Sequence, residues 1–95
     1  MKQIVAIVQP HRLEQIEQAL HGLDHLPGFT IFPSRGHARG QGSHHAFVST
    51  EWNPDTHDRL TLMMFCADEH AQSIVEAIRA AAHTGNPGDG LIAVT

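Results

Sequence analysis

The sequence contains a single cysteine, Cys66, no tyrosine and no long run of apolar residues. One cysteine excludes a disulfide within the chain, so we expect a reducing compartment and a cytoplasmic location. No apolar stretch approaches the roughly 18 residues that a membrane-spanning helix needs. The start, Met1-Lys2-Gln3, leads directly into a strand-like run, so we expect no signal peptide. These absences exclude the disulfide-stapled and membrane-spanning classes.

Positive charge is also scarce. The 95 residues include six Lys and Arg against ten Asp and Glu, for a formal net charge of −4. The basic residues are scattered and form no stripe, which argues against nucleic acid or an anionic membrane surface as the main partner. With 41% apolar and 17% charged residues, the chain is typical of one small globular domain spanning residues 1–95.

The first third of the chain predicts a strand, a helix and a strand. Ile4–Val8 is a β-branched apolar run, typical of a strand buried on both faces. Pro10 favours a helix start, and apolar residues follow at helical spacing. A second strand is predicted from Phe29 to Pro33, with Pro33 at a sheet edge because proline donates no backbone hydrogen bond. The apolar helix positions are Leu13, Ile16, Leu20 and Leu23.

The rest of the chain predicts a long loop followed by a strand, a helix and a strand. Residues from about 36 to 58 lack periodicity, and a loop of that length in so small a domain is usually functional or mobile. Leu60–Cys66 is the third strand, Asp68 is the expected N-cap of the second helix, and Leu91–Val94 is the fourth strand. The order βαββαβ predicts an α+β, ferredoxin-like sandwich with both helices on one sheet face.

The predicted strands raise a packing question. Two helices cover one face of the sheet, yet the first and third strands are apolar on both faces, where a sheet with one wet face should alternate. Another copy of the chain is the expected cover for the second face. The alternative is that short strands simply expose a few apolar residues, as protein surfaces often do.

The segment from Thr84 to Gly90 is a glycine-rich turn between the second helix and the last strand. Gly85, Gly88 and Gly90 tolerate unusual backbone angles, and Asp89 can bond neighbouring amides. The amide groups of such a turn can converge on an anion. The turn is therefore a candidate anion-binding site.

The ordered motifs resemble the nitrogen-regulatory PII signalling proteins over almost the whole chain. The run Ile4 to Leu13 resembles that family's first strand and its lysine-proline-phenylalanine-lysine-leucine helix start. Thr84-Gly85 and Gly88-Asp89-Gly90 resemble its B-loop, and the long middle segment falls on its T-loop. The resemblance extends to a divergent, short PII-like branch associated with heavy-metal efflux. It implies a homotrimer with ligand clefts between subunits.

The resemblance also implies a function and a ligand site. The chain is expected to be a non-enzymatic regulator that senses an adenine nucleotide, an anion or a metal ion, and then acts through its T-loop on a partner such as a membrane transporter or efflux system. Nothing in the sequence pairs a nucleophile with a base at a spacing suited to catalysis. The implied ligand-binding residues are Gly36, Arg39, Gly40, Gly85, Gly88, Asp89 and Gly90.

Several positions depart from the family pattern. Trp52 replaces the T-loop tyrosine that accepts a nucleotidyl group, so that modification is absent. Gly40 stands where the family has a glutamine, and Leu91 where it has a phosphate-binding lysine, whereas Arg59 replaces an oxoglutarate-binding lysine. The family's C-terminal arginines have no counterpart before Thr95. Each lost charge-assisted contact costs about 1.5–3 kcal/mol, which favours a weakly held nucleotide or a small anion such as bicarbonate or phosphate.

Nine histidines are the one compositional excess. His37, His44 and His45 lie close together on the loop and could hold zinc or copper, since neutral imidazole is a common ligand of both. The alternatives are a solvated polar loop and a pH-sensitive one. A rival function is therefore a trimeric heavy-metal-binding protein of the cation-tolerance type. His21 and His25, four residues apart, are a weaker candidate pair.

Overall fold

The computed structural model describes residues 1–37, 56–85 and 90–95. Within them the elements alternate as the sequence predicts, so the α+β, ferredoxin-like βαββαβ order is confirmed. A short 3-10 helix precedes each α-helix: η1 at Pro10–Arg12 and η2 at Asp68–His70. The strands are β1 Lys2–Val8, β2 Phe29–His37, β3 Thr56–Cys66 and β4 Gly90–Val94, and the α-helices are α1 Leu13–His21 and α2 Ala71–Ala82.

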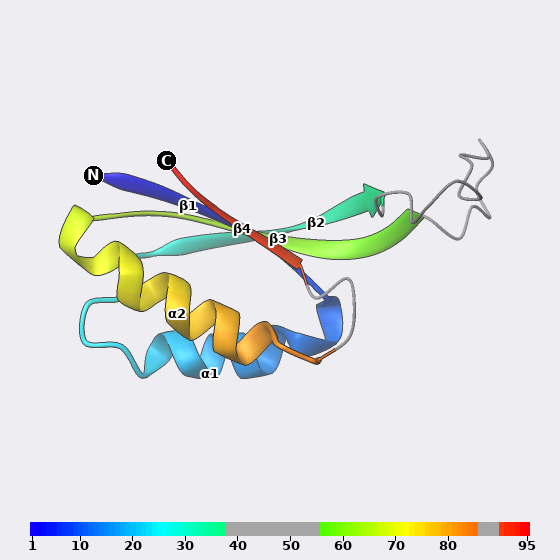
Figure 1. Ribbon diagram of the computed structural model, residues 1–95, viewed down its shortest axis with the longest axis horizontal. Helices are drawn as coiled ribbons and strands as arrows, with labels where there is room; N and C mark the ends of the chain where they lie inside the picture. Colours follow the sequence, from blue (N-terminus) through cyan, green and yellow to red (C-terminus); the bar gives the residue numbers. More distant parts are fainter. Residues whose placement is uncertain (38–55, 86–89) are drawn as a thin grey trace.

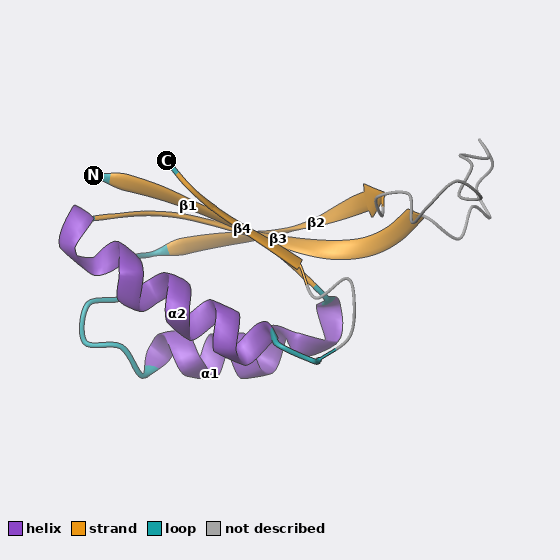
Figure 2. Ribbon diagram, viewed as in Figure 1, coloured by secondary structure: helices purple, strands orange, loops and turns teal. Residues whose placement is uncertain are grey.

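The four strands form one antiparallel sheet in the order β2-β3-β1-β4. Both helices lie against the same face of this sheet, and no described element covers the other face (Figures 1 and 2). β2 is an edge strand, which fits the expectation for Pro33, since an edge tolerates a residue without a backbone N–H. None of the helices in the described ranges combines the length and apolar character needed to cross a bilayer.

The core lies between the sheet and the two helices. Alternate residues of β1 and β3 point toward the helices, because successive side chains of a strand face opposite sides. The buried side chains come from both the sheet and the helices. They include Ile4, Ala6 and Val8 of β1, Leu62 and Met64 of β3, Ile16 and Leu20 of α1, and Ile74 and Ile78 of α2. The helical spacing in the sequence therefore identified the buried face of α1, where Ile16 and Leu20 are buried.

Two predicted strand ends were wrong. β2 continues past Pro33 to His37, and β3 begins at Thr56 rather than Leu60. The added pairs, which run to His37↔Thr56, are joined by the backbone ladder, and this pairing needs no apolar alternation in the sequence. Part of the predicted loop of about 36–58 is thus paired strand, and residues 38–55 lie outside the described residues.

The predicted N-cap of the second helix was also wrong. α2 begins at Ala71 with His70 in the N-cap position, and no side chain caps it. Asp68 instead opens η2, and its carboxylate lies 2.6 Å from the amino group of Met1. This ion pair lowers the pKa of Asp68 below its ordinary value of 3.8, first through the hydrogen bond from the amino group and then through its charge.

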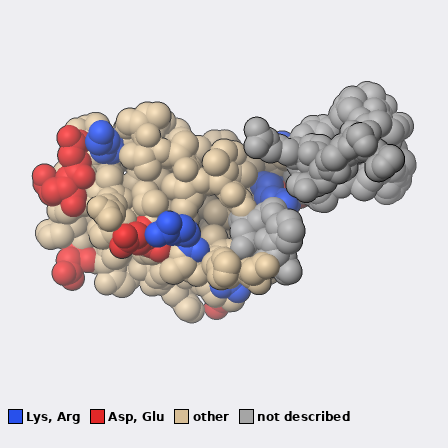
Figure 3. Space-filling view, in the orientation of Figure 1, with Lys and Arg blue, Asp and Glu red and all other residues tan. Residues whose placement is uncertain are grey.

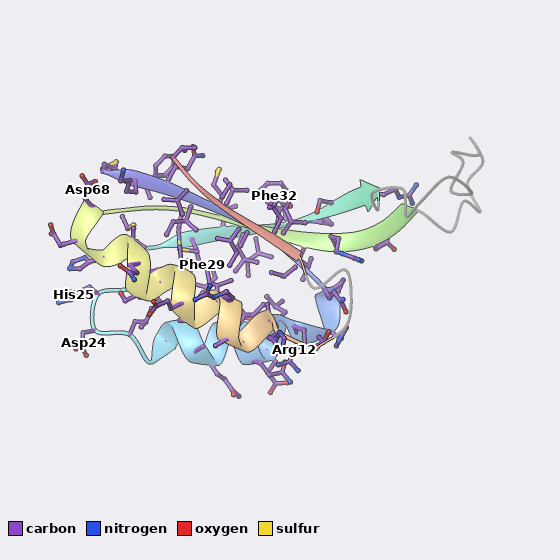
Figure 4. All side chains as sticks on the ribbon, in the orientation of Figure 1. Arg12, Asp24, His25, Phe29, Phe32 and Asp68 are labelled. Carbon is purple, nitrogen blue, oxygen red and sulfur yellow. The ribbon has the colours of Figure 1, made fainter. Side chains whose placement is uncertain are left out.

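The sheet face opposite the helices is apolar, as predicted. We call it the open face. Phe29 of β2 points toward the helices whereas Phe32 points to the open face (Figure 4). Phe32 is 41% exposed, Phe65 of β3 is 52% exposed and Leu91 of β4 is 61% exposed. These side chains come from three different strands, so the apolar surface extends across the sheet.

Candidate functional site

The turn of residues 84–90 follows α2, and the end of that helix is held by Arg12. Arg12 lies at the end of η1 and reaches across to the last turn of α2 (Figure 4). Its Nε and Nη2 atoms both donate to the carbonyl oxygen of Ala81, at 2.9 and 2.6 Å. This carbonyl has no partner within the helix because it belongs to the last turn. Arg12 therefore fixes the place where the chain leaves α2.

Both described glycines of the turn have positive φ angles. Gly85 has φ 83° and Gly90 has φ 135°, values that side chains rarely allow. A β-carbon on Gly90 would overlap the carbonyl oxygen of Ile7 on the adjacent strand. Gly90 pairs with Val8 in the sheet, so its lack of a side chain lets β4 begin directly against β1. The turn therefore begins at a backbone conformation that favours glycine and ends where only glycine fits against β1.

The other described ligand-site candidate, Gly36, lies in β2 beside Arg59. A β-carbon on Gly36 would meet Cγ of Arg59 at 3.8 Å, and Nη1 of Arg59 donates to the carbonyl oxygen of Asp58 at 2.9 Å. Next to them, the Thr61 hydroxyl donates to the Ser34 hydroxyl at 2.9 Å. The structure therefore brings together Gly36 and Arg59, two positions that the resemblance assigned to ligand binding, at a polar end of the open face.

Gly36 and Gly90 do not meet within one chain. They lie toward the same end of the sheet but on its opposite edge strands, with β3 and β1 between them. Three strand spacings of 4.7–4.9 Å separate the edge strands by about 14 Å. The remaining predicted ligand residues, Arg39, Gly40, Gly88 and Asp89, lie outside the described residues.

The histidine predictions are only partly within the described residues. The backbone of His37 ends β2, opposite Thr56, whereas His44 and His45 lie outside the described ranges. Among the residues that the structure describes, no three His, Cys, Asp or Glu side chains are grouped so that they could hold a metal ion. The loop-histidine site stays a prediction.

A different histidine pair is present. His25 stacks on His70 with ring centroids 4.4 Å apart and an interplanar angle of 2°. Sequence spacing suggested His21 as the partner of His25. The His21 ring instead lies beside the ring of Phe29, with centroids 6.4 Å apart. The two stacked residues are far apart in the sequence: His25 lies in the turn after α1, and His70 lies in η2. No local spacing signal could have found the pair.

The arrangement of helices and sheet defines a ferredoxin-like α+β domain. A family model described as "Nitrogen regulatory protein P-II" matches residues 1–95. The chain is 36% identical to the nitrogen regulatory protein P-II of Rhizobium meliloti (strain 1021) and 34% identical to that of Azospirillum brasilense, each over 95 residues. The P-II protein of Pyropia yezoensis is 30% identical over the same length. These alignments cover 100% of the chain and 84% of each relative.

The chain therefore belongs to the nitrogen regulatory protein P-II family. It is a signal-transduction protein of that family, and the resemblance drawn from its motifs is confirmed.

Proposed function

We propose that this protein is a trimeric regulator that binds a small effector in clefts between its copies. The observation that carries the proposal is the glycine-rich segment before β4, which follows the end of α2 held by Arg12 and ends at Gly90, close against β1. Defined ends reduce the reorganisation that ligand binding at a glycine-rich turn requires. Family membership supports the same role.

The sheet topology supports a cleft shared between copies. Gly36 and Gly90 lie on the two edge strands of one sheet, and three strand spacings separate those edges by about 14 Å. In a closed ring, the β2 edge of one copy would lie next to the β4 edge of another. A ligand between copies would then contact both positions, together with Arg39, Gly40, Gly88 and Asp89. The apolar open face supplies a surface for such an assembly.

The effector that we propose is an adenine nucleotide held weakly, or a small anion. Leu91 occupies the place of the family's phosphate-binding lysine, and its side chain is 61% exposed. A phosphate loses one charge-assisted contact there, which corresponds to about a tenfold to hundredfold loss of affinity. Bicarbonate or phosphate needs fewer such contacts. We further propose that effector binding acts through the segment around residues 36–58 on a partner, a membrane transporter, in the cytoplasm.

Calorimetry with ATP, ADP, AMP, bicarbonate and phosphate tests the proposal. Heat is expected with at least one nucleotide or anion, and Leu91→Lys should strengthen nucleotide binding about tenfold or more because it restores the missing contact. A matched control is Leu91→Gln, which is polar but uncharged. Gly90→Ala should weaken nucleotide or anion binding both in the wild type and in Leu91→Lys.

Zinc and copper(II) belong in the same experiment. The proposal fails if neither the wild type nor Leu91→Lys binds any nucleotide or anion. Micromolar metal binding that is abolished by His44→Ala with His45→Ala would then identify a metal-binding protein, with His37, His44 and His45 as ligands. Loop histidines that bind no metal would leave that second function without support.

A further inference from the structure

The two stacked histidines, His25 and His70, lie at the end of the molecule opposite the turn of residues 84–90. His25 belongs to the connection between α1 and β2, and His70 ends η2, directly before α2. Gly90 pairs with the last residue of β1, whereas η2 follows Cys66, which pairs with the first residue of β1. Figure 4 shows His25 at one end of the helix layer and Arg12 at the other. The pair is therefore separate from the ligand site proposed above.

The contact between these two residues is made by ring faces alone. Their centroids are 4.4 Å apart and their planes differ by 2°. Among the residues that the structure describes, neither ring forms a hydrogen bond or an ion pair through its nitrogen atoms. His25 is exposed and His70 is partly exposed, so water reaches both. The stack joins the connection of residues 22–28 to the start of α2.

The charge of the rings decides whether this contact is favourable. Histidine is the side chain that ordinarily gains a charge between pH 8 and pH 5. One proton on the pair places no like charges together, but two protons place two positive charges about 4.4 Å apart, where they repel even in water. Separated rings therefore bind two protons more readily than stacked rings, and low pH favours separation.

The surroundings of the pair are mainly acidic. Figure 3 shows acidic side chains gathered at this end of the molecule, with one basic side chain beside them. Carboxylates keep their charge between pH 5 and pH 8, whereas another histidine or the terminal amino group can also change charge in that range. A test must therefore isolate the pair. The charged groups of the elements that meet here are His21 and Asp24 before and within the connection, Asp68 and Glu69 in η2, and Met1 and Lys2 at the N-terminus; the first turn of α2 adds no acid.

We propose that His25 and His70 form a pH-sensitive switch. At neutral pH the stacked rings hold the connection of residues 22–28 against η2. When both rings are protonated they separate, and the connection is released from the start of α2. The switch belongs to one chain and does not rest on the proposed effector or on assembly.

NMR spectroscopy of the full chain tests the switch directly. Nuclear Overhauser contacts between the two imidazoles should be present at about pH 7.5 and lost at about pH 5. His25→Phe keeps an aromatic ring against His70 but removes one of the two charges, so its ring contacts should persist at both pH values. His21→Gln removes an imidazole outside the stack and should leave the pH response unchanged.

A double-mutant cycle separates the pair from the other groups that titrate. The variants are His25→Ala, His70→Ala and the two together, compared by urea unfolding. The coupling between the positions, expressed as a ratio of unfolding constants, should fall about fivefold from pH 7.5 to pH 5 at low salt, which corresponds to two unit charges 4.4 Å apart in water. In about 1 M salt the change should be less than about twofold, since exposed charges are then screened within about 3 Å.

Several results would overturn the proposal. Ring contacts that survive in the wild type at pH 5 would show that two protons do not separate the stack. Ring contacts that are lost equally in His25→Phe would remove the second charge from the argument, as would a coupling that is the same at both pH values. A pH response that disappears in His21→Gln would assign it to His21 instead. These measurements need no nucleotide or anion, so their outcome is distinct from that of the calorimetry.

Discussion

Three glycines of this chain differ in what a β-carbon would meet. At Gly28 nothing lies within 4 Å, and its φ is not positive. At Gly85 the space is also open, but φ is 83°. At Gly90 both restrictions apply, because φ is 135° and the carbonyl of Ile7 occupies the position. The three sites therefore separate backbone strain from steric overlap.

We predict a graded loss of stability on substitution of these glycines by alanine. Gly28→Ala should change the free energy of unfolding by less than about 0.5 kcal/mol. Gly85→Ala should cost about 1–2 kcal/mol, the usual penalty of a left-handed residue with a side chain. Gly90→Ala should cost more, about 2–4 kcal/mol, since β4 must also move away from β1. Urea denaturation measures the free energy of unfolding of all three variants, provided that the slope of that free energy against urea concentration is unchanged. Equal losses of stability at Gly28 and Gly90 would show that the positive φ and the close approach to Ile7 do not restrict position 90.

The ion pair between Met1 and Asp68 predicts a pH-dependent stability. Because folding lowers the pKa of Asp68 from its ordinary value of 3.8, the contribution of the ion pair to stability is present above that value and is lost as pH falls through the folded value. Asp68→Asn should therefore lower the melting temperature at pH 6. The difference from the wild type should shrink below pH 4 and vanish once Asp68 is protonated.

The neighbouring exposed acid provides the control for this measurement. Glu69 also lies in η2, so Glu69→Gln removes a similar charge without removing the contact to Met1. A wild-type advantage over Asp68→Asn that persists unchanged to pH 2 would show that the ion pair is not its source.

At the scale of elements, Arg12 joins two ends of the fold that are 69 residues apart in the sequence. Arg12→Ala should reduce the free energy of unfolding by about 1.5–3 kcal/mol, because it removes a charged donor from a part-buried carbonyl. Hydrogen exchange should accelerate most at the end of α2. Arg12→Lys should recover part of the loss, since a lysine can donate to the same carbonyl but without the planar fork.

Arg35 offers a matched control. Its nearest described acid is Asp58, at 3.7 Å and largely exposed, a kind of pair that contributes little. Arg35→Ala should change stability by less than about 1 kcal/mol. If Arg12→Ala behaved like Arg35→Ala, the bond to Ala81 would not hold the end of α2.

The sequence predicted every strand and α-helix of the described fold, because apolar periodicity reports which side chains are buried. It failed at the ends of β2 and β3, where pairs such as Gly36↔His57 depend on backbone hydrogen bonds. The prediction of Asp68 as a helix N-cap failed for a similar reason. That side chain met the amino group of Met1 across the fold, a competing partner that no local pattern contains.

The site was predictable where residue type alone carries the information. Glycine at positions 85 and 90 indicated unusual backbone angles, and the structure has them. Arg12 could not be identified as a support of the turn, because its partner is a backbone carbonyl of a distant helix.

At the scale of the whole molecule, the open face is an apolar surface that a single copy leaves uncovered. Phe32 and Phe65 are 41% and 52% exposed, and burying an aromatic side chain of this kind contributes about 1.5–3 kcal/mol. Each copy in a trimer gains that contribution at every covered position. We therefore expect assembly at micromolar concentration, with sedimentation above the 10.4 kDa of one chain.

Phe65→Glu tests both the assembly and its connection to the effector site. A carboxylate buried in the interface would be unpaired and strongly unfavourable, so the variant should sediment as a single copy. Because Phe65 is already half exposed in one chain, the fold should survive, as circular dichroism would show. Gln15→Glu adds the same charge on the exposed side of α1 and should leave the assembly intact.

The effector response of the same variant completes the argument. If the ligand lies between the β4 edge of one copy and the β2 edge of the next, a folded single copy of Phe65→Glu must lose nucleotide or anion binding. A single-copy protein that still binds the nucleotide or anion with wild-type affinity would place the whole site within one chain, and the shared cleft would have to be abandoned.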